Sequence, residues 1–125
     1  MILGTGIDII EVSRIETAYV KFGERFVNRI LLASEVAYCL AYRRPAPFLA
    51  VRFAAKEAVS KAFGTGLGAE IGWRDIEICR RATGEPYVQL HGKGEQLFAA
   101  RGAKKLHLSL SHTEQYAAAT AILEG

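Results

Sequence analysis

A helical segment that ends in a run of alternating glycines lies at the centre of this 125-residue chain. The segment Arg52–Gly68 reads RFAAKEAVSKAFGTGLG. Positions three and four apart are neighbours on a helix, so Glu57, Lys61 and Gly64 lie along one stripe. A carboxylate, an ammonium group and a position without a side chain suit a metal ion with an anionic ligand. The same Glu-x-x-x-Lys spacing is also common as plain helix support, worth ~0.2–0.5 kcal/mol.

Length and composition predict a single domain, residues 1–125. Half of the residues are hydrophobic, which is enough for a packed core, and the net charge of +3 suits acidic partners or phosphate-rich substrates. Cys39 and Cys79 lack the C-x-x-C spacing of a zinc site, so we expect buried free thiols in a reducing compartment. Asp8 comes too early for a signal peptide, and no apolar run approaches the ~20 residues of a membrane helix. We therefore expect a cytoplasmic protein.

Hydrophobic periodicity, capping residues and turn residues predict an α+β fold. The expected elements are a strand over Met1–Ile10, a helix from the Ser13–Glu16 capping box to near Gly23, a short helical piece, a helix from its N-cap Ser34 to Pro45, a central helix from Pro47 to Gly64, paired strands at Asp75–Arg80 and Pro86–Leu90, a helix over Glu95–Arg101, and paired strands at Leu106–His112 and Tyr116–Leu123. Because helices come early and hairpins come late, we expect a mainly antiparallel sheet wrapped around the long central helix.

Asp8 is an unexpected acid in an apolar strand. A carboxylate there is costly unless it is paired or bound to a metal, although an acid near a strand end can also cap a loop. If the strand packs on the central helix, Asp8 and Glu57 can share one cation. Two carboxylates with phosphate oxygens and waters are a usual environment for Mg²⁺. The residues by themselves thus indicate Mg²⁺-assisted phosphate chemistry.

Basic residues and histidines offer further contacts to an anionic ligand. Arg52, Lys56 and Lys61 can neutralise phosphate charge, and His107 or His112 can bond a phosphate, although each histidine taken alone can be purely structural. A second basic set comprises Arg14, Lys21, Arg25 and Arg29, which would share one face of a continuous helix. Such a face is either a solvated surface or a docking surface for an acidic partner.

Three motifs in the same order resemble the signature set of 4′-phosphopantetheinyl transferases, most closely the small bacterial type. They are GID at Gly6–Asp8, FAAKEAVSKAFG at Phe53–Gly64 and SLSH at Ser109–His112. The resemblance covers nearly the whole chain. It implies transfer of the 4′-phosphopantetheine arm of coenzyme A to a serine of apo-acyl carrier protein, release of adenosine 3′,5′-bisphosphate, and a role in fatty acid biosynthesis.

The resemblance also implies roles for individual residues. Asp8 and Glu57 would bind Mg²⁺ on the pyrophosphate, Glu57 would take the serine proton directly or through a metal-bound water, and Lys61 would stabilise the pyrophosphate charge. The coenzyme A contacts implied by the resemblance are Arg52 and His107 at the 3′-phosphate, Lys61 at the pyrophosphate, and Gly64, Gly66 and Pro86 around the nucleotide. The implied carrier-protein contacts are Arg14, Arg25 and Arg29.

Ile10 marks a departure from the larger members of this family, which resemble G-x-D-x-E at the first motif. The missing acid implies that water takes the place of a third protein ligand. The small members are homotrimers with active sites between subunits, which would explain the alanine-rich strand Tyr116–Leu123. Two other interpretations remain: a small basic module that binds an acidic protein or RNA, and a regulatory trimer that binds coenzyme A without catalysis.

Overall fold

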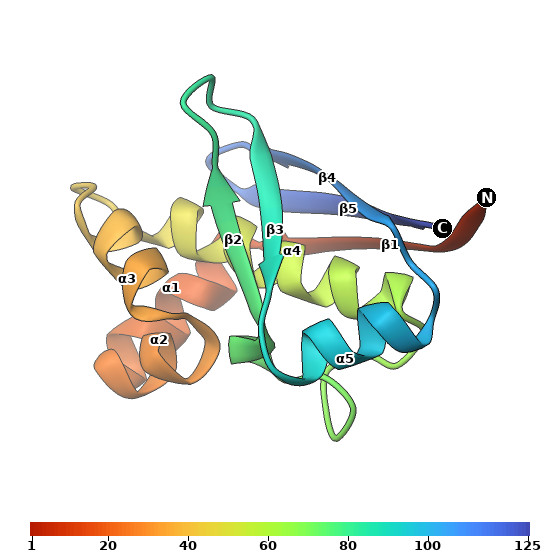
Figure 1. Cartoon of the computed structure of the whole chain (residues 1–125). Coiled ribbons are helices and arrows are strands. Elements are labelled where there is room, and N and C mark those ends of the chain that lie inside the picture. The colour runs from red at the N-terminus through yellow and green to blue at the C-terminus, as the bar shows by residue number, and fades with distance from the viewer.

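The computed structural model describes all residues of the chain, 1–125 (Figure 1). In chain order the elements are β1 (Ile2–Glu11), α1 (Val12–Phe22), α2 (Glu24–Ile30), α3 (Ala33–Leu40), α4 (Ala46–Ala62), the 3-10 turn η1 (Trp73–Asp75), β2 (Ile76–Arg80), β3 (Pro86–Leu90), α5 (Lys93–Ala100), β4 (Lys105–His112) and β5 (Tyr116–Glu124). No helix is both long and apolar enough to cross a membrane.

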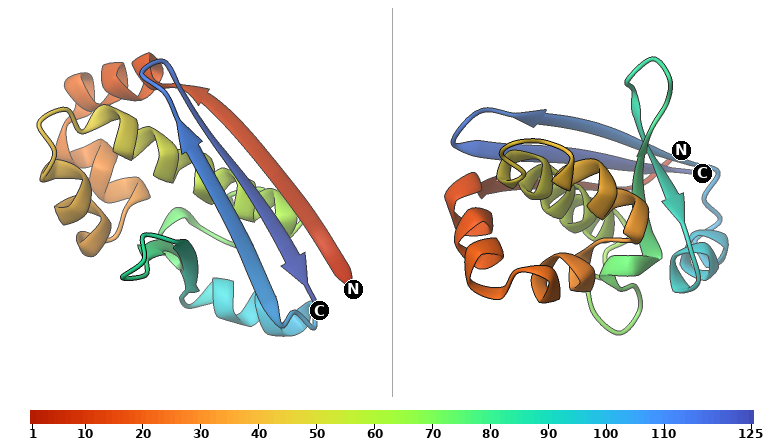
Figure 2. Two further views of the ribbon diagram at one scale, coloured as in Figure 1. Left: turned by 90° about the horizontal axis from the view of Figure 1, so that it is seen from above. Right: turned by 90° about the vertical axis from the view of Figure 1, so that its left-hand side faces the viewer.

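Two antiparallel sheets lie on either side of α4 (Figures 1 and 2). The larger sheet has the order β1-β5-β4, and the smaller is the β2-β3 hairpin. The inner faces of both sheets pack on α4 in one hydrophobic cluster, which includes Ala58 and Phe63 of the α4 region, Ile78 of β2 and Ala119 of β5. The predicted α+β fold, with antiparallel strands around a long central helix, is confirmed.

Two glycines let β1 lie directly on the backbone of α4. A Cβ atom added at Gly6 would come 1.8 Å from the carbonyl oxygen of Ala58, and one at Gly4 would come 1.9 Å from that of Ala62. No side chain fits at either position, because real Cβ atoms do not approach a backbone oxygen so closely. This contact brings Asp8, two residues after Gly6, alongside the middle of α4.

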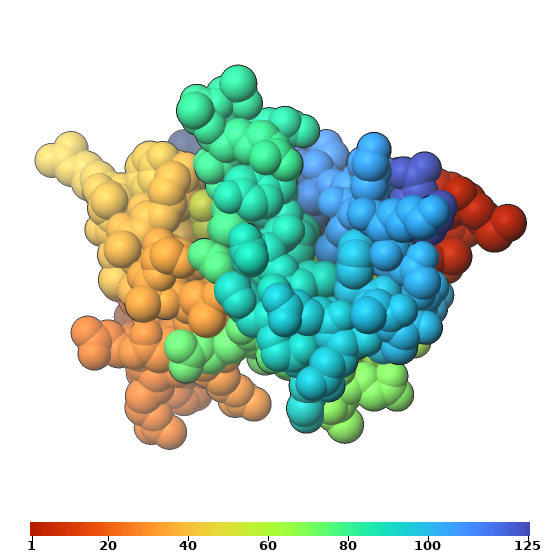
Figure 3. All heavy atoms as spheres, viewed as in Figure 1, coloured from red at the N-terminus to blue at the C-terminus, as the bar shows by residue number.

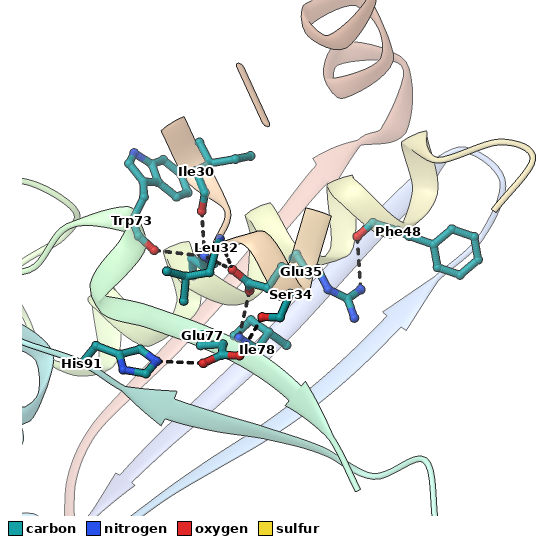
Figure 4. Close-up of polar contacts among 11 residues, drawn as sticks. Ile30, Leu32, Ser34, Glu35, Phe48, Trp73, Glu77, Ile78 and His91 are labelled. Carbon is teal, nitrogen blue, oxygen red and sulfur yellow. Dashed lines mark hydrogen bonds and ion pairs between the residues drawn. The ribbon is translucent and has the colours of Figure 1, made fainter. Parts of the chain in front are cut away.

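A buried ion pair joins α4 to the elements on its other side. Lys56 Nζ donates to Glu35 Oε1 at 2.7 Å, to the Ile30 carbonyl at 2.7 Å and to the Trp73 carbonyl at 3.0 Å. Glu35 in turn accepts the backbone N–H of Ile78 at 2.9 Å (Figure 4). All three donors of the ammonium group are therefore used inside the protein. The prediction that Lys56 neutralises phosphate charge is wrong.

Three helix starts differ from their predictions, and at two of them a side chain has a distant partner. The capping box at Ser13 does not form: α1 begins at Val12 without a side-chain cap, and Glu16 pairs with Arg44 at 3.2 Å. Ser34 is not an N-cap either, since α3 begins at Ala33 and the Ser34 hydroxyl donates to Glu77 Oε2 at 2.9 Å. The central helix starts one residue early, at Ala46.

The two cysteines are both free but differ in burial. Cys39 is buried, and burial raises the pKa of its thiol to about 11. Cys79 on β2 is only half-buried, so the prediction of two buried thiols holds for Cys39 alone. Burial followed by the charge of Glu77 raises the pKa of Cys79 as well, so both thiols stay protonated and unreactive near neutral pH.

We expect Glu35→Gln to destabilise the protein by about 3–5 kcal/mol, because removing the charge of one partner leaves the Lys56 ammonium unpaired in the core. Glu85→Gln is the matched control, since Glu85 pairs with Arg81 at 3.5 Å on the surface; an exposed pair of this kind contributes less than ~1 kcal/mol. Urea unfolding of both variants at one protein concentration measures the difference. Equal losses of stability would contradict a structural role for the buried pair.

Candidate active site

Asp8 reaches α4 from the edge of the larger sheet. β1 pairs only with β5, where Asp8 lies opposite Ala119, and its other edge is free. Because side chains alternate along a strand, Asp8 faces inward, whereas Ile7 and Ile9 face outward and are 66% and 67% exposed. The acid therefore sits at the line where the free edge of β1 meets α4.

Lys61 binds Asp8 rather than its helical neighbour. Its Nζ atom lies 3.1 Å from Asp8 Oδ1 and 2.9 Å from the Ile7 carbonyl oxygen. The i,i+4 ion pair with Glu57 that the spacing allows is not formed, and the carboxylate of Glu57 has no hydrogen-bond or ion-pair partner. The tertiary contact with β1 thus replaces the local helix pair.

Glu57 is a half-buried carboxylate next to a second negative charge. Burial is the largest cause that raises the pKa of Glu57, the charge of Asp8 raises it further, and the charge of Lys61 opposes both. The two acids that sequence reasoning assigned to a metal are therefore brought together in space. They form a pair and not a larger cluster, because no group of three or more metal-binding side chains occurs.

The glycine loop after α4 requires two left-handed residues. Gly64 has φ of 80° and Gly66 has φ of 65°, values that residues with a Cβ atom rarely adopt. The N–H of Gly64 bonds to the carbonyl of Lys61 at 2.9 Å, so the chain turns away directly after the Glu57–Lys61 stripe. The loop thus begins beside the candidate site, as the sequence predicted.

Arg52 is a buried cation with an unsatisfied donor. Its residue is 2% exposed, and its guanidinium lies 4.2 Å from the ring centre of Tyr38. One amino group donates to the Phe48 carbonyl at 3.4 Å, but the buried Nε atom has no hydrogen-bond partner. Because the Arg52 side chain is enclosed by the protein, its contact with a phosphate stays a prediction.

A hollow of about 490 Å³ is lined by Phe48, by other aromatic and basic side chains, and by one acid, Glu114. Phe48 stacks on Tyr42 at 3.6 Å between ring centres and meets His112 edge-on at 5.5 Å. Arg43 and Arg44 line the same hollow. Sequence reasoning weighed His112 only as an alternative to His107, although the SLSH motif that contains His112 was the available signal.

His107 and Pro86 lie apart from the Asp8–Glu57 pair. Leu106 and Leu108 pack inward on α4, so His107 points to the outer face of the sheet, where its Nε2 lies 2.9 Å from Glu124 Oε1. Pro86 begins β3 at the hairpin whose tip projects from the surface (Figure 3). Within one copy of the chain, neither residue joins the two carboxylates, and both assignments stay predictions.

The basic residues near the N-terminus form an exposed surface with apolar content. Arg14 lies on α1, Arg25 and Arg29 lie on α2, and Gly23, with φ of 57°, separates the two helices. Arg25 and Arg29 line a hollow of about 420 Å³ together with Ala18, Phe22 and Phe26. Arg25 and Arg29, but not Arg14, thus lie beside an exposed apolar patch, which the spacing of charges did not reveal.

Comparison with known proteins identifies the family. Residues 4–121 match the 4′-phosphopantetheinyl transferase superfamily, and the chain belongs to this family. It is 48% identical over 124 residues to the holo-[acyl-carrier-protein] synthase of Koribacter versatilis, with 99% of each chain covered. The holo-[acyl-carrier-protein] synthase of Neisseria meningitidis has the same fold, with a TM-score of 0.93, 35% identity and both chains covered completely.

A solved relative also contains the expected donor. The Helicobacter pylori holo-[acyl-carrier-protein] synthase in complex with coenzyme A matches with a TM-score of 0.86 and 31% identity over 96% of this chain and 99% of that one. The resemblance proposed from the three sequence motifs is therefore confirmed at the level of the family.

We expect Asp8→Asn to lower the pKa of Glu57 in metal-free protein, because it removes the neighbouring negative charge and frees Lys61 to pair with Glu57. The pKa should nevertheless stay above that of an exposed glutamate, since burial is the larger cause of its elevation. Carbon-13 NMR of the labelled Glu carboxyl groups measures this titration, with Glu57→Gln identifying the signal. An unchanged or higher pKa would show that the two acids do not interact.

Proposed function

We propose that this chain is a holo-[acyl-carrier-protein] synthase. It transfers 4′-phosphopantetheine from coenzyme A to a serine hydroxyl of apo-acyl carrier protein, releases adenosine 3′,5′-bisphosphate, and so serves fatty acid biosynthesis. The observation that carries this proposal is the Asp8 carboxylate of β1 held beside Glu57 and Lys61 of α4. Full-length relatives with nearly half of their residues identical carry the same name.

Asp8 and Glu57 are the residues that would hold Mg²⁺. The fit rests on the carboxylate of Glu57, which has no protein partner, and on Asp8, which is close enough to raise the pKa of Glu57. Two carboxylates leave most of the coordination sphere for waters and phosphate oxygens, as Mg²⁺ prefers. When bound, the ion supplies neutralisation of the charge on the pyrophosphate.

Glu57 and Lys61 perform complementary tasks in the transfer. Glu57 accepts the proton of the serine hydroxyl, directly or through a water, as the oxygen attacks the β-phosphate. Lys61, on the exposed side of the same helix, stabilises the charge that develops on the departing phosphate. Both groups stand on a helix fixed by the core, which holds them in position for the reaction.

The remaining residues predicted to bind coenzyme A are assigned to its nucleotide end. Arg52 is assigned to the 3′-phosphate, and Gly64, Gly66 and Pro86 are assigned to the surroundings of the nucleotide. His107 stays a candidate for the same phosphate from the outer face of the sheet. The hollow around His112 adds a further candidate, because it combines aromatic surfaces with Arg43 and Arg44.

We propose a homotrimer with active sites between subunits. The outer face of the larger sheet exposes Ile7, Ile9, Tyr116 and Ile122, an apolar surface of the kind that a partner covers. His107 is on this outer face, whereas Asp8 faces inward, so a neighbouring copy would bring a second His107 to a coenzyme A bound at Asp8. An active site formed between two subunits would therefore bring all of the assigned residues to one coenzyme A molecule.

The exposed Arg14, Arg25 and Arg29 are proposed to bind the carrier protein. The hollow between Arg25, Arg29 and the two phenylalanines can receive an apolar side chain while the arginines meet acidic groups around it. Exposed aromatic side chains do lie among arginines, at Phe22 and Tyr42. A basic RNA-binding module fits less well because the family match and the full-length relatives both indicate a transferase.

We propose that residues 1–125 act as one domain, since α4 contributes to both hydrophobic clusters of the chain. The free thiols of Cys39 and Cys79 support a reducing, cytoplasmic location.

Incubation with coenzyme A, Mg²⁺ and apo-acyl carrier protein should increase the mass of the carrier by one phosphopantetheine group, and chelation of Mg²⁺ should prevent the increase. Glu57→Gln and Asp8→Asn should each lower the rate at least 100-fold, because each removes a carboxylate from the metal pair. Intact-mass spectrometry reads the product, and circular dichroism checks the fold of each variant. Full activity of Asp8→Asn with Mg²⁺ would refute the metal assignment.

Arg14→Glu should raise the KM for the carrier protein at least tenfold while leaving the KM for coenzyme A within about twofold. The reason is that a reversed charge repels an acidic partner but lies outside the phosphate site. Arg81→Glu at the β2–β3 turn is the matched control, since it makes the same exposed charge change elsewhere. Equal effects of the two variants would indicate a general electrostatic attraction in place of a docking surface.

A further inference from the structure

The ion pair of Lys61 involves the same carboxylate that is assigned to the metal. Lys61 Nζ lies 3.1 Å from Asp8 Oδ1, and Asp8 forms no other ion pair. The side chain of Asp8 is only 18% exposed, whereas that of Lys61 is 48% exposed. A divalent cation on Asp8 would thus lie next to an ammonium group, and like charges at such a separation repel strongly where water is partly excluded.

Only one partner of this pair is free to move. Asp8 belongs to a strand fixed between β5 and the backbone of α4, where Gly6 leaves no space for displacement. Lys61 has a flexible four-carbon side chain that is half exposed, and its second acceptor is a carbonyl at the free edge of β1. Water can replace the ammonium group at that carbonyl, so separation of the pair requires movement of Lys61 alone.

The charges at the site favour transfer of the Lys61 ammonium group from Asp8 to an anionic ligand. Asp8, Glu57 and Lys61 together carry a formal charge of −1, and a divalent ion changes this to +1. A site of charge +1 attracts a pyrophosphate, and the ammonium group released from Asp8 needs a new anion. The pyrophosphate of coenzyme A can serve as that anion, because a lysine side chain binds phosphate as a mobile point charge.

We propose that Lys61 is an exchangeable counterion, which neutralises Asp8 until a divalent cation replaces it and then moves to the pyrophosphate of coenzyme A. This inference rests on the proposed function. It makes the binding of metal and coenzyme A cooperative, since neither ligand alone satisfies both Asp8 and Lys61. Cooperativity of this kind is reciprocal: coenzyme A tightens metal binding by the same factor by which the metal tightens coenzyme A binding.

Lys61 differs in this respect from Lys56, five residues earlier on the same helix. Lys56 is fully buried and donates to three oxygens, so its removal damages the fold. The pair of Lys61 is partly exposed, and such pairs contribute little to stability. Replacement of Lys61 by an uncharged side chain should therefore give a folded protein in which ligand binding can be measured.

The test is a binding cycle with Mn²⁺ as the probe, followed by the paramagnetic signal of the free ion. The Kd of Mn²⁺ is measured without coenzyme A and with saturating coenzyme A, with correction for Mn²⁺ bound to free coenzyme A. The proteins are wild type, Lys61→Met and the control Lys93→Met. Lys93 carries the same charge and donates to the Ala69 carbonyl at 3.0 Å, but contacts no carboxylate.

For the wild type and Lys93→Met we expect coenzyme A to tighten Mn²⁺ binding at least tenfold. Adenosine 3′,5′-bisphosphate, which lacks the pyrophosphate, should tighten it less than threefold. For Lys61→Met we expect at least fivefold tighter Mn²⁺ binding without coenzyme A, and a cooperativity factor reduced at least fivefold.

The inference is overturned if Lys61→Met binds Mn²⁺ no more tightly than the wild type without coenzyme A, or if its cooperativity factor is unchanged. Equal effects of Lys61→Met and Lys93→Met would also overturn it, because they would reflect net charge alone. If the wild type transfers phosphopantetheine but the variants give any of these results, the proposed function stands and only the role of Lys61 as an exchangeable counterion is lost. A wild type that binds no coenzyme A and transfers nothing loses both.

Discussion

Direct contact between the backbones of β1 and α4 is the constraint on which the site depends. Gly4 and Gly6 place the strand so close to the carbonyl oxygens of Ala62 and Ala58 that no side chain separates them. Asp8 follows at the next inward position and therefore lies within hydrogen-bond distance of Lys61 and close enough to raise the pKa of Glu57. If the strand were held away by side chains, the two carboxylates could not interact and Lys61 could not reach Asp8.

Two lysines of the central helix show how position within the fold determines function. Lys56 faces α2, α3 and η1, where the Glu35 carboxylate and two backbone carbonyls accept its three hydrogen bonds. Lys61 faces the free edge of β1 and remains half exposed. One lysine thus joins the two sides of the core, while the other is available for an anionic ligand. The chemistry of the side chain is the same, and the difference lies in which elements pack around it.

Sequence reasoning located most elements and the central acids, because these depend on local patterns. The alternation of Leu106, Leu108 and Leu110 predicted β4, and the Glu57–Lys61 stripe predicted the face of α4 that meets Asp8. The predictions failed where a side chain had a distant competitor. Glu16 bonds to Arg44 and Ser34 bonds to Glu77, so neither residue completes the local cap that its spacing allows.

The sequence by itself determined the fold class and the family, because periodicity and short motifs carry that information within a few residues. Only the tertiary structure decided that Lys61 pairs with Asp8, that Lys56 is buried, that Arg52 keeps an unused donor and that His107 faces away from the site. Those outcomes depend on contacts between residues up to 53 positions apart, as for Asp8 and Lys61. Such contacts exist only after the chain has folded, since local spacing does not specify which distant groups will compete for a side chain.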